Sequence, residues 1–156
     1  MKAIDNPGVY IPPPLLYAAI FIGAVLIQKK VDLDNSLFKT RFILFTSLVF
    51  FVPAIFFIVR SLTQFVRTRN TVMTIKAAES LQITGIYQIS RNPMYLGLVF
   101  IYLGLTCLIG NWWNIILLPL LLFIIQEYVI RREEKYLERK FGEDYIRYKQ
   151  EVRRWL

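Results

Sequence analysis

The chain has 156 residues, of which 56% are hydrophobic and 19% are charged, with 19 Lys and Arg against 11 Asp and Glu. It holds no histidine and one cysteine, which excludes a disulfide scaffold, a zinc site of cysteine and histidine, and catalysis that depends on histidine. A mean hydropathy of +0.46 and 15% aromatic residues exclude a disordered chain and are typical of a small, basic membrane protein.

Four apolar blocks follow one another along the chain, at residues 9–27, 42–59, 95–109 and 112–130. A bilayer core needs roughly 20 apolar residues in a helix, and the third block approaches that length if its helix begins at Pro93. Four such blocks leave too little polar surface for a soluble protein. We therefore expect an all-α integral membrane protein with about four transmembrane helices, the first of which is a helix rather than a signal peptide.

Only the short stretch 110–114 separates the third block from the fourth, which predicts a tight helical hairpin. Gly97 and Gly104 lie seven residues apart in the third block, so they share a helix face along which a neighbouring helix can approach closely. Cys107, in the same block, is expected to pack in the core rather than to react.

Basic residues predict the orientation of the chain in the membrane. With four spans, the N-terminus, residues 60–92 and the tail 131–156 share one side, and all but four of the 19 Lys and Arg residues lie there. This side should be cytoplasmic, although the residues that flank the first block alone favour the opposite orientation. Because the charges lie directly beside apolar helices, we expect membrane lipids and no nucleic acid as partners.

Two polar segments lie on the predicted cytoplasmic side. Residues 61–92 read as a helical extension followed by a loop of the kind that often carries function. The tail 131–156 reads as an amphipathic helix divided at Gly142, with an apolar stripe suited to an interfacial anchor. The stripe consists of Leu137, Phe141, Tyr145, Tyr148 and Val152.

The polar cluster most suited to chemistry combines the start of the third helix with the end of the fourth. Arg91, Asn92 and Tyr95 begin the third helix, and Glu133 and Glu134 follow the fourth. A tight antiparallel hairpin brings these two ends to the same membrane face. The set predicts a pocket for a zwitterionic or polyionic ligand, or alternatively a lattice of salt bridges at the level of the headgroups.

Two signatures carry a resemblance to a known family. Residues 85–97 follow the pattern G-x-Y-x-x-x-R-H/N-P-x-Y-x-G, and residues 132–148 follow R-E-E-x-x-L, then F-G-x-x-Y-x-x-Y. Together they resemble the integral membrane methyltransferases that include isoprenylcysteine carboxyl methyltransferase and the phospholipid N-methyltransferases. The resemblance covers about residues 68–156, and the small size suggests a prokaryotic member of the cytoplasmic membrane.

This resemblance implies transfer of a methyl group from S-adenosylmethionine to a lipophilic small-molecule or prenylated substrate at the cytoplasmic face, with no metal. Asn92 stands where the carboxyl methyltransferases usually have histidine, so it is expected to position groups rather than to exchange protons. The catalytic residues implied are Arg91, Asn92, Glu133 and Glu134. The cofactor contacts implied are Tyr87, Ser90, Arg91, Asn92, Tyr95, Leu96, Glu133 and Glu134.

The chain is expected to form one methyltransferase domain over residues 1–156. Residues 1–60 supply the first two helices, and residues 61–156 supply the cofactor-binding loop, the hairpin and the tail. Two alternatives remain open: an NADPH-binding protein related to membrane sterol reductases, which share a similar C-terminal signature, and a non-catalytic membrane adaptor that retains the fold.

Overall fold

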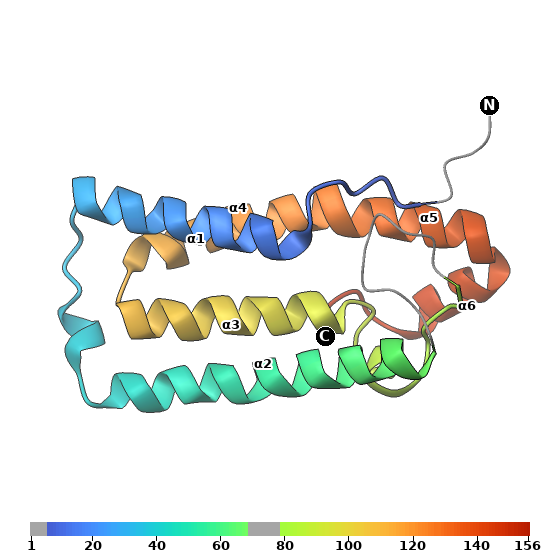
Figure 1. Cartoon of the computed structure of the whole chain (residues 1–156), viewed down its shortest axis with the longest axis horizontal. Helices are drawn as coiled ribbons and strands as arrows, with labels where there is room; N and C mark the ends of the chain where they lie inside the picture. Colours follow the sequence, from blue (N-terminus) through green and yellow to red (C-terminus); the bar gives the residue numbers. More distant parts are fainter. Residues whose placement is uncertain (1–5, 69–78) are drawn as a thin grey trace.

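The computed structural model describes residues 6–68 and 79–156, and every regular element in these two ranges is a helix. Lys2, Arg69 and Lys76, which contributed to the predicted orientation, lie outside these ranges, as does the middle of the predicted loop. Four long helical segments run along the length of the molecule (Figure 1). They are α1 (Pro13–Lys30), α2 (Phe42–Arg67), α3 (Pro93–Ile109) and the continuous run that begins with α4 (Trp112–Ile124).

The last of these segments continues without a break past the predicted end of the fourth block. A π-helical turn, η3 (Ile125–Ile130), follows α4 and leads into α5 (Arg131–Phe141). Gly142, at φ +56°, then ends α5, and α6 (Glu143–Glu151) follows. This break confirms the predicted division of the tail, because the left-handed region of φ is one that glycine enters easily.

The hairpin prediction is also confirmed. Gly110 adopts the left-handed conformation at the C-cap of α3, and Asn111 accepts a hydrogen bond from the backbone N–H of Trp113 at the N-cap of α4. The two tryptophans at this turn hold the loop that joins α1 to α2. Trp112 Nε1 donates to the carbonyl of Asp34, and Trp113 Nε1 donates to that of Val31. The loop includes the short helix η1 (Ser36–Lys39).

Close packing of α2 on α3 depends on the two glycines that the sequence placed on one face. A Cβ atom on Gly97 would lie 2.6 Å from Cγ1 of Ile58, and one on Gly104 would lie 2.8 Å from the ring of Phe51. Between these positions, Phe57 of α2 stacks on Phe100 of α3 with ring centroids 6.0 Å apart. The glycines therefore do what was expected of them, which is to let the two helices approach.

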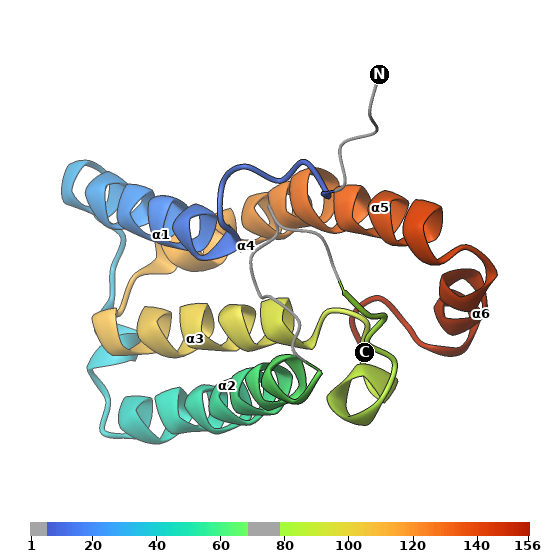
Figure 2. The same ribbon diagram turned by 45° about the vertical axis from the view of Figure 1, so that its right-hand side comes forward.

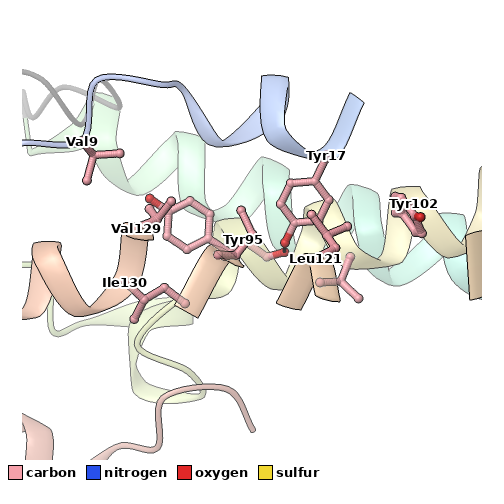
Figure 3. Packing of buried hydrophobic residues seen from close by; sticks show 9 residues of the cluster. Val9, Tyr17, Tyr95, Tyr102, Leu121, Val129 and Ile130 are labelled. Atoms are coloured by element: carbon pink, nitrogen blue, oxygen red, sulfur yellow. Dashed lines mark hydrogen bonds between the residues drawn. The ribbon is translucent and has the colours of Figure 1, made fainter. Parts of the chain in front are cut away.

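A separate hydrophobic cluster joins α1 to α3 and to the α4–η3 segment. Tyr17 of α1, Tyr95 and Tyr102 of α3, and Leu121 of α4 belong to it (Figure 3). Val9, which precedes α1, packs into the same cluster near Val129 and is fully buried. The segment before α1 is thus fixed over the part of the helix that leads into α5.

Two helical segments of the described chain are long and apolar enough to cross a membrane: α2, and the continuous run Trp112–Phe141. The third block does begin at Pro93, but α3 has 17 residues and falls below the length of these two. α1 has 18 residues, which include prolines at its start and Lys29 and Lys30 at its end, and it does not meet the same criterion. The four helices are therefore present, whereas four membrane crossings stay a prediction.

Candidate active site

The start of α3 and the start of α5 meet, as the hairpin geometry predicted. The Tyr95 hydroxyl donates a hydrogen bond to Oε1 of Glu133 at 2.6 Å. The Tyr17 hydroxyl donates to the backbone carbonyl of Tyr95 at 3.2 Å, which fixes the first turn of α3 against α1. Pro93 occupies the first turn, where its fixed φ suits a helix and its missing N–H costs nothing.

Glu134 lies at the centre of a buried ion cluster. Its Oε1 is 3.0 Å from Nη1 of Arg91, and Arg154 contacts it with two nitrogens, Nε at 2.9 Å and Nη2 at 2.7 Å. The side chains of Glu134 and Arg91 are 8% and 9% exposed. Paired contact of this kind between a guanidinium and a carboxylate is among the stronger polar interactions in proteins. Glu133 and Glu134, although adjacent, thus have different partners.

The chain after α6 returns to the start of α3 and binds the first signature (Figure 2). The backbone N–H of Arg91 donates to the carbonyl of Arg153 at 3.0 Å. The carbonyl of Arg154 accepts from the hydroxyl of Ser90 at 3.3 Å and from Nδ2 of Asn92 at 2.9 Å. Ser90 and Asn92, which were predicted as cofactor contacts, are therefore engaged by the chain itself.

Tyrosines of the two signatures form the wall between the ion cluster and α2. The Tyr148 hydroxyl donates to the backbone carbonyl of Tyr87 at 2.6 Å, and Nη1 of Arg91 lies 3.5 Å from the Tyr145 hydroxyl. Burial, and secondarily the charge of Glu134, raises the pKa of Tyr145 to about 12, although Arg91 acts in the opposite direction. Burial also raises the pKa of Tyr87 and of Tyr148 far above the usual range. All three phenols stay protonated at neutral pH, and the hydroxyl of Tyr148 donates whereas that of Tyr145 accepts from Arg91.

The apolar stripe of the tail packs inside the protein. Tyr145 and Tyr148 belong to a buried cluster with Phe57, Tyr87 and Leu96, and Leu137, Phe141 and Val152 pack against it. The expectation that this stripe anchors the tail at the membrane interface was wrong, because its surface is covered by α2, α3 and the turn η2 (Gly85–Gln88). Leu96, a predicted cofactor contact, is a member of this cluster.

The predicted site residues are thus brought together in two groups. Tyr95 and Glu133 form one, and Ser90, Arg91, Asn92 and Glu134 form the other, around the returning chain. Arg154 was missed, and no pattern in the sequence marks it among the other basic residues of the tail. Two other acidic residues near the site are engaged elsewhere, because Glu127 pairs with Arg131 and Glu138 pairs with Lys149.

A small polar pocket lies on the outer side of the site, between the end of α2 and η2. Its lining includes none of the predicted site residues and consists of Arg60, Thr63, Gln64, Arg67, Gly85 and Ile86. Over residues 6–68 and 79–156, no cluster of three or more acidic, cysteine or histidine side chains is placed to hold a metal ion.

Comparison with known proteins agrees with the two signatures. Residues 40–144 match the model of a family described as phospholipid methyltransferase. Protein-S-isoprenylcysteine O-methyltransferase of Saccharomyces cerevisiae is 38% identical over 69 residues, and that of Schizosaccharomyces pombe is 37% identical over 68 residues. Each match covers 44% of this chain but only 29% of the yeast protein.

A bacterial relative is matched over its whole length. An uncharacterized protein of Haemophilus influenzae is 50% identical over 66 residues, which are 40% of this chain and 100% of that protein. No solved structure matches the chain. The family model covers more than half of the chain and includes the first signature and the start of the second, so the prediction of a methyltransferase is confirmed at the level of the family. The chain belongs to the phospholipid methyltransferase family of membrane methyltransferases.

Proposed function

We propose that the chain transfers a methyl group from S-adenosylmethionine to a lipophilic, membrane-resident acceptor. The observation that carries the proposal is the hydrogen bond between Tyr95 and Glu133, because it joins the two signature segments at one place. Family membership supports methyl transfer. The acceptor is either a carboxylate, as the names of the two yeast relatives suggest, or a lipid amine.

The residues at the site fit the chemical groups of the proposed cofactor. Nε of Arg91 is buried and has no hydrogen-bond partner among the described residues, so it offers a donor to a carboxylate. Glu133 uses Oε1 for Tyr95 and offers its other oxygen to a hydroxyl or an ammonium group. The buried rings of Tyr87 and Tyr95 suit an adenine or a cationic methyl group.

When bound, S-adenosylmethionine supplies an activated methyl group on a sulfonium, so the protein is left to position the reactants and to shape the electric field. A carboxylate acceptor reacts without losing a proton. An ammonium acceptor must first give a proton to a base. Glu134 is engaged by two guanidinium groups, and we therefore assign that role to Glu133.

We further propose four membrane crossings, with the site at the cytoplasmic face. The outward face of α2 is strongly apolar and exposed, as at Phe45, Val52 and Ile55, which suits contact with lipid. Arg131 and Lys149 lie exposed on the helices around the site, where they suit anionic headgroups. The acceptor would enter sideways from the bilayer between the helices.

Calorimetric titration of the detergent-purified protein tests the proposal. We expect binding of S-adenosylmethionine by the wild type and at least about tenfold weaker binding by Glu133→Gln, the loss typical of a hydrogen bond to a charged group. Glu138→Gln is the matched control, because Glu138 lies on the same helix, is partly exposed and pairs with Lys149. Binding of NADPH in place of S-adenosylmethionine would instead identify a reductase-like protein, and binding of neither would favour an adaptor.

The acceptor is then identified with a radiolabelled methyl donor. Membrane lipids and farnesylated cysteine analogues are offered in parallel, and labelled products are treated with base. Release of the label by base indicates a methyl ester and hence a carboxylate acceptor, whereas retention indicates an amine.

A further inference from the structure

The segment after α6 is held at the candidate site by contacts along its length. Its backbone carbonyls at Arg153 and Arg154 accept three hydrogen bonds from Ser90, Arg91 and Asn92, across 62 to 64 residues of sequence. Trp155 packs against both hydrophobic clusters of the described chain. The segment is therefore built into the site and is not loosely attached to the surface.

The segment after α6 brings a second positively charged side chain to Glu134. Arg91 and Arg154 both contact Glu134, so two guanidinium groups share one carboxylate. The Arg91 side chain is only 9% exposed, and its buried Nε has no hydrogen-bond partner among the described residues. A buried donor of this kind is costly unless a ligand or water satisfies it. An incoming anion would satisfy this donor.

We propose that Arg154 completes a two-guanidinium cradle with Arg91, and that this cradle binds the carboxylate of the amino-acid part of S-adenosylmethionine. Glu134 holds the two guanidinium groups in place and acts as a positioning residue. The segment that follows α6 is then a wall of the cofactor site. The inference rests on the proposed function and adds Arg154, which lies outside both signatures.

Two ligands separate a role in carboxylate recognition from a general role in stability. S-adenosylhomocysteine carries both the carboxylate and the ammonium group, whereas its decarboxylated analogue keeps the ammonium group alone. We expect Arg154→Gln to weaken binding of S-adenosylhomocysteine by about 10- to 100-fold, the range of a lost charged hydrogen bond. Binding of the decarboxylated analogue should change less than about twofold, because the lost partner is absent from that ligand.

Two further variants serve as controls. Arg153→Gln should bind both ligands as the wild type does. The Arg153 side chain is exposed, and only its backbone carbonyl, which the substitution keeps, contacts the site. Arg154→Lys should restore part of the affinity for S-adenosylhomocysteine, since it keeps the charge but loses the paired geometry. Thermal unfolding of each variant in detergent reports any change in folding separately from binding.

The outcomes separate this inference from the proposed function. The proposed cradle is wrong, while the methyltransferase proposal stands, if Arg154→Gln weakens binding of both ligands equally or leaves the binding of both unchanged. The same holds if Arg154→Gln binds S-adenosylhomocysteine more tightly than the wild type does. Tighter binding would mean that the segment blocks the site. If the wild type binds neither adenosyl ligand, the proposed function and the cradle both fail.

Discussion

Tyr95 donates its hydroxyl to Glu133 across the helical hairpin, at a distance of 2.6 Å and a separation of 38 residues. Tyr95 lies in the first signature and Glu133 lies in the second. The bond therefore joins two segments whose sequence patterns are each weak evidence when taken alone. It also divides the acidic pair, because Glu133 stays beside a neutral phenol while Glu134 is neutralised by two arginines.

Removal of either partner of this bond should impair methyl transfer more than folding. We expect Tyr95→Phe and Glu133→Gln each to lower kcat/KM by about 10- to 100-fold, in the range of a lost positioned acid, base or charged hydrogen bond. Their combination should cost less than the sum of the two separate losses, because Tyr95 acts on the reaction through the Glu133 carboxylate that it orients. Steady-state kinetics on the four proteins measure this coupling. Full additivity of the two losses would mean that the residues act independently.

Loss of the carboxylate at Glu134 should destabilise the fold. Glu134→Ala leaves the buried Arg91 and the partly exposed Arg154 close together without their counter-charge, and loss of one partner of a buried ion pair typically costs about 3–5 kcal/mol in the free energy of unfolding. Glu138→Ala on the same helix breaks an exposed pair with Lys149 and should cost about 1 kcal/mol or less. Thermal and denaturant unfolding in detergent compare the two variants. Equal stability would show that the cluster contributes nothing to the fold.

The sequence predicts much of this fold because its strongest signals are local. Apolar blocks set the long helices, Pro93 and Gly110 set the ends of α3, and Gly142 divides the tail. The number of membrane crossings does not follow from the same signals, since α1 combines prolines and lysines with its apolar residues. Helical periodicity alone does not distinguish a stripe that faces lipid from one that faces the protein, so it did not predict that the stripe of the tail packs inside.

The candidate site is predictable where a short connection brings two of its segments together. It is not predictable where the chain reverses its direction far along the sequence. The hairpin between α3 and α4 brings Tyr95 to Glu133, and this follows from a short connection. Arg154 reaches Glu134 only because the chain reverses after α6 and Trp155 fixes it between two clusters. No short-range pattern distinguishes Arg154 from Arg153, whose side chain is exposed.

The close packing of α2 on α3 should be sensitive to the addition of a single methyl group. Gly97→Ala places Cβ 2.6 Å from Cγ1 of Ile58 and 3.3 Å from the backbone carbonyl of Ala54, so the Ile58 side chain or the helices themselves must shift. We expect a loss of about 1–3 kcal/mol in the free energy of unfolding, as for other overpacked sites. Gly23→Ala in α1 is the control, because its added Cβ meets nothing within 4 Å and alanine favours a helix. If Gly97→Ala is as stable as the control, the close approach is not needed.

Tyr145 should make the stability of the fold depend on pH in the alkaline range. Burial is the main reason that its pKa rises from 10.0 to about 12 in the folded protein. Because the folded state holds this proton more tightly than the unfolded state, the contribution to stability is fully present below pH 10 and is lost as the pH rises toward 12. We therefore expect the melting temperature of the wild type to fall more steeply between pH 10 and 12 than that of Tyr145→Phe, which has no proton to lose. Differential scanning fluorimetry in detergent at several pH values measures both slopes. Parallel slopes would show that the phenol of Tyr145 is exposed to solvent in the folded protein, against its burial beside Arg91 and Tyr148.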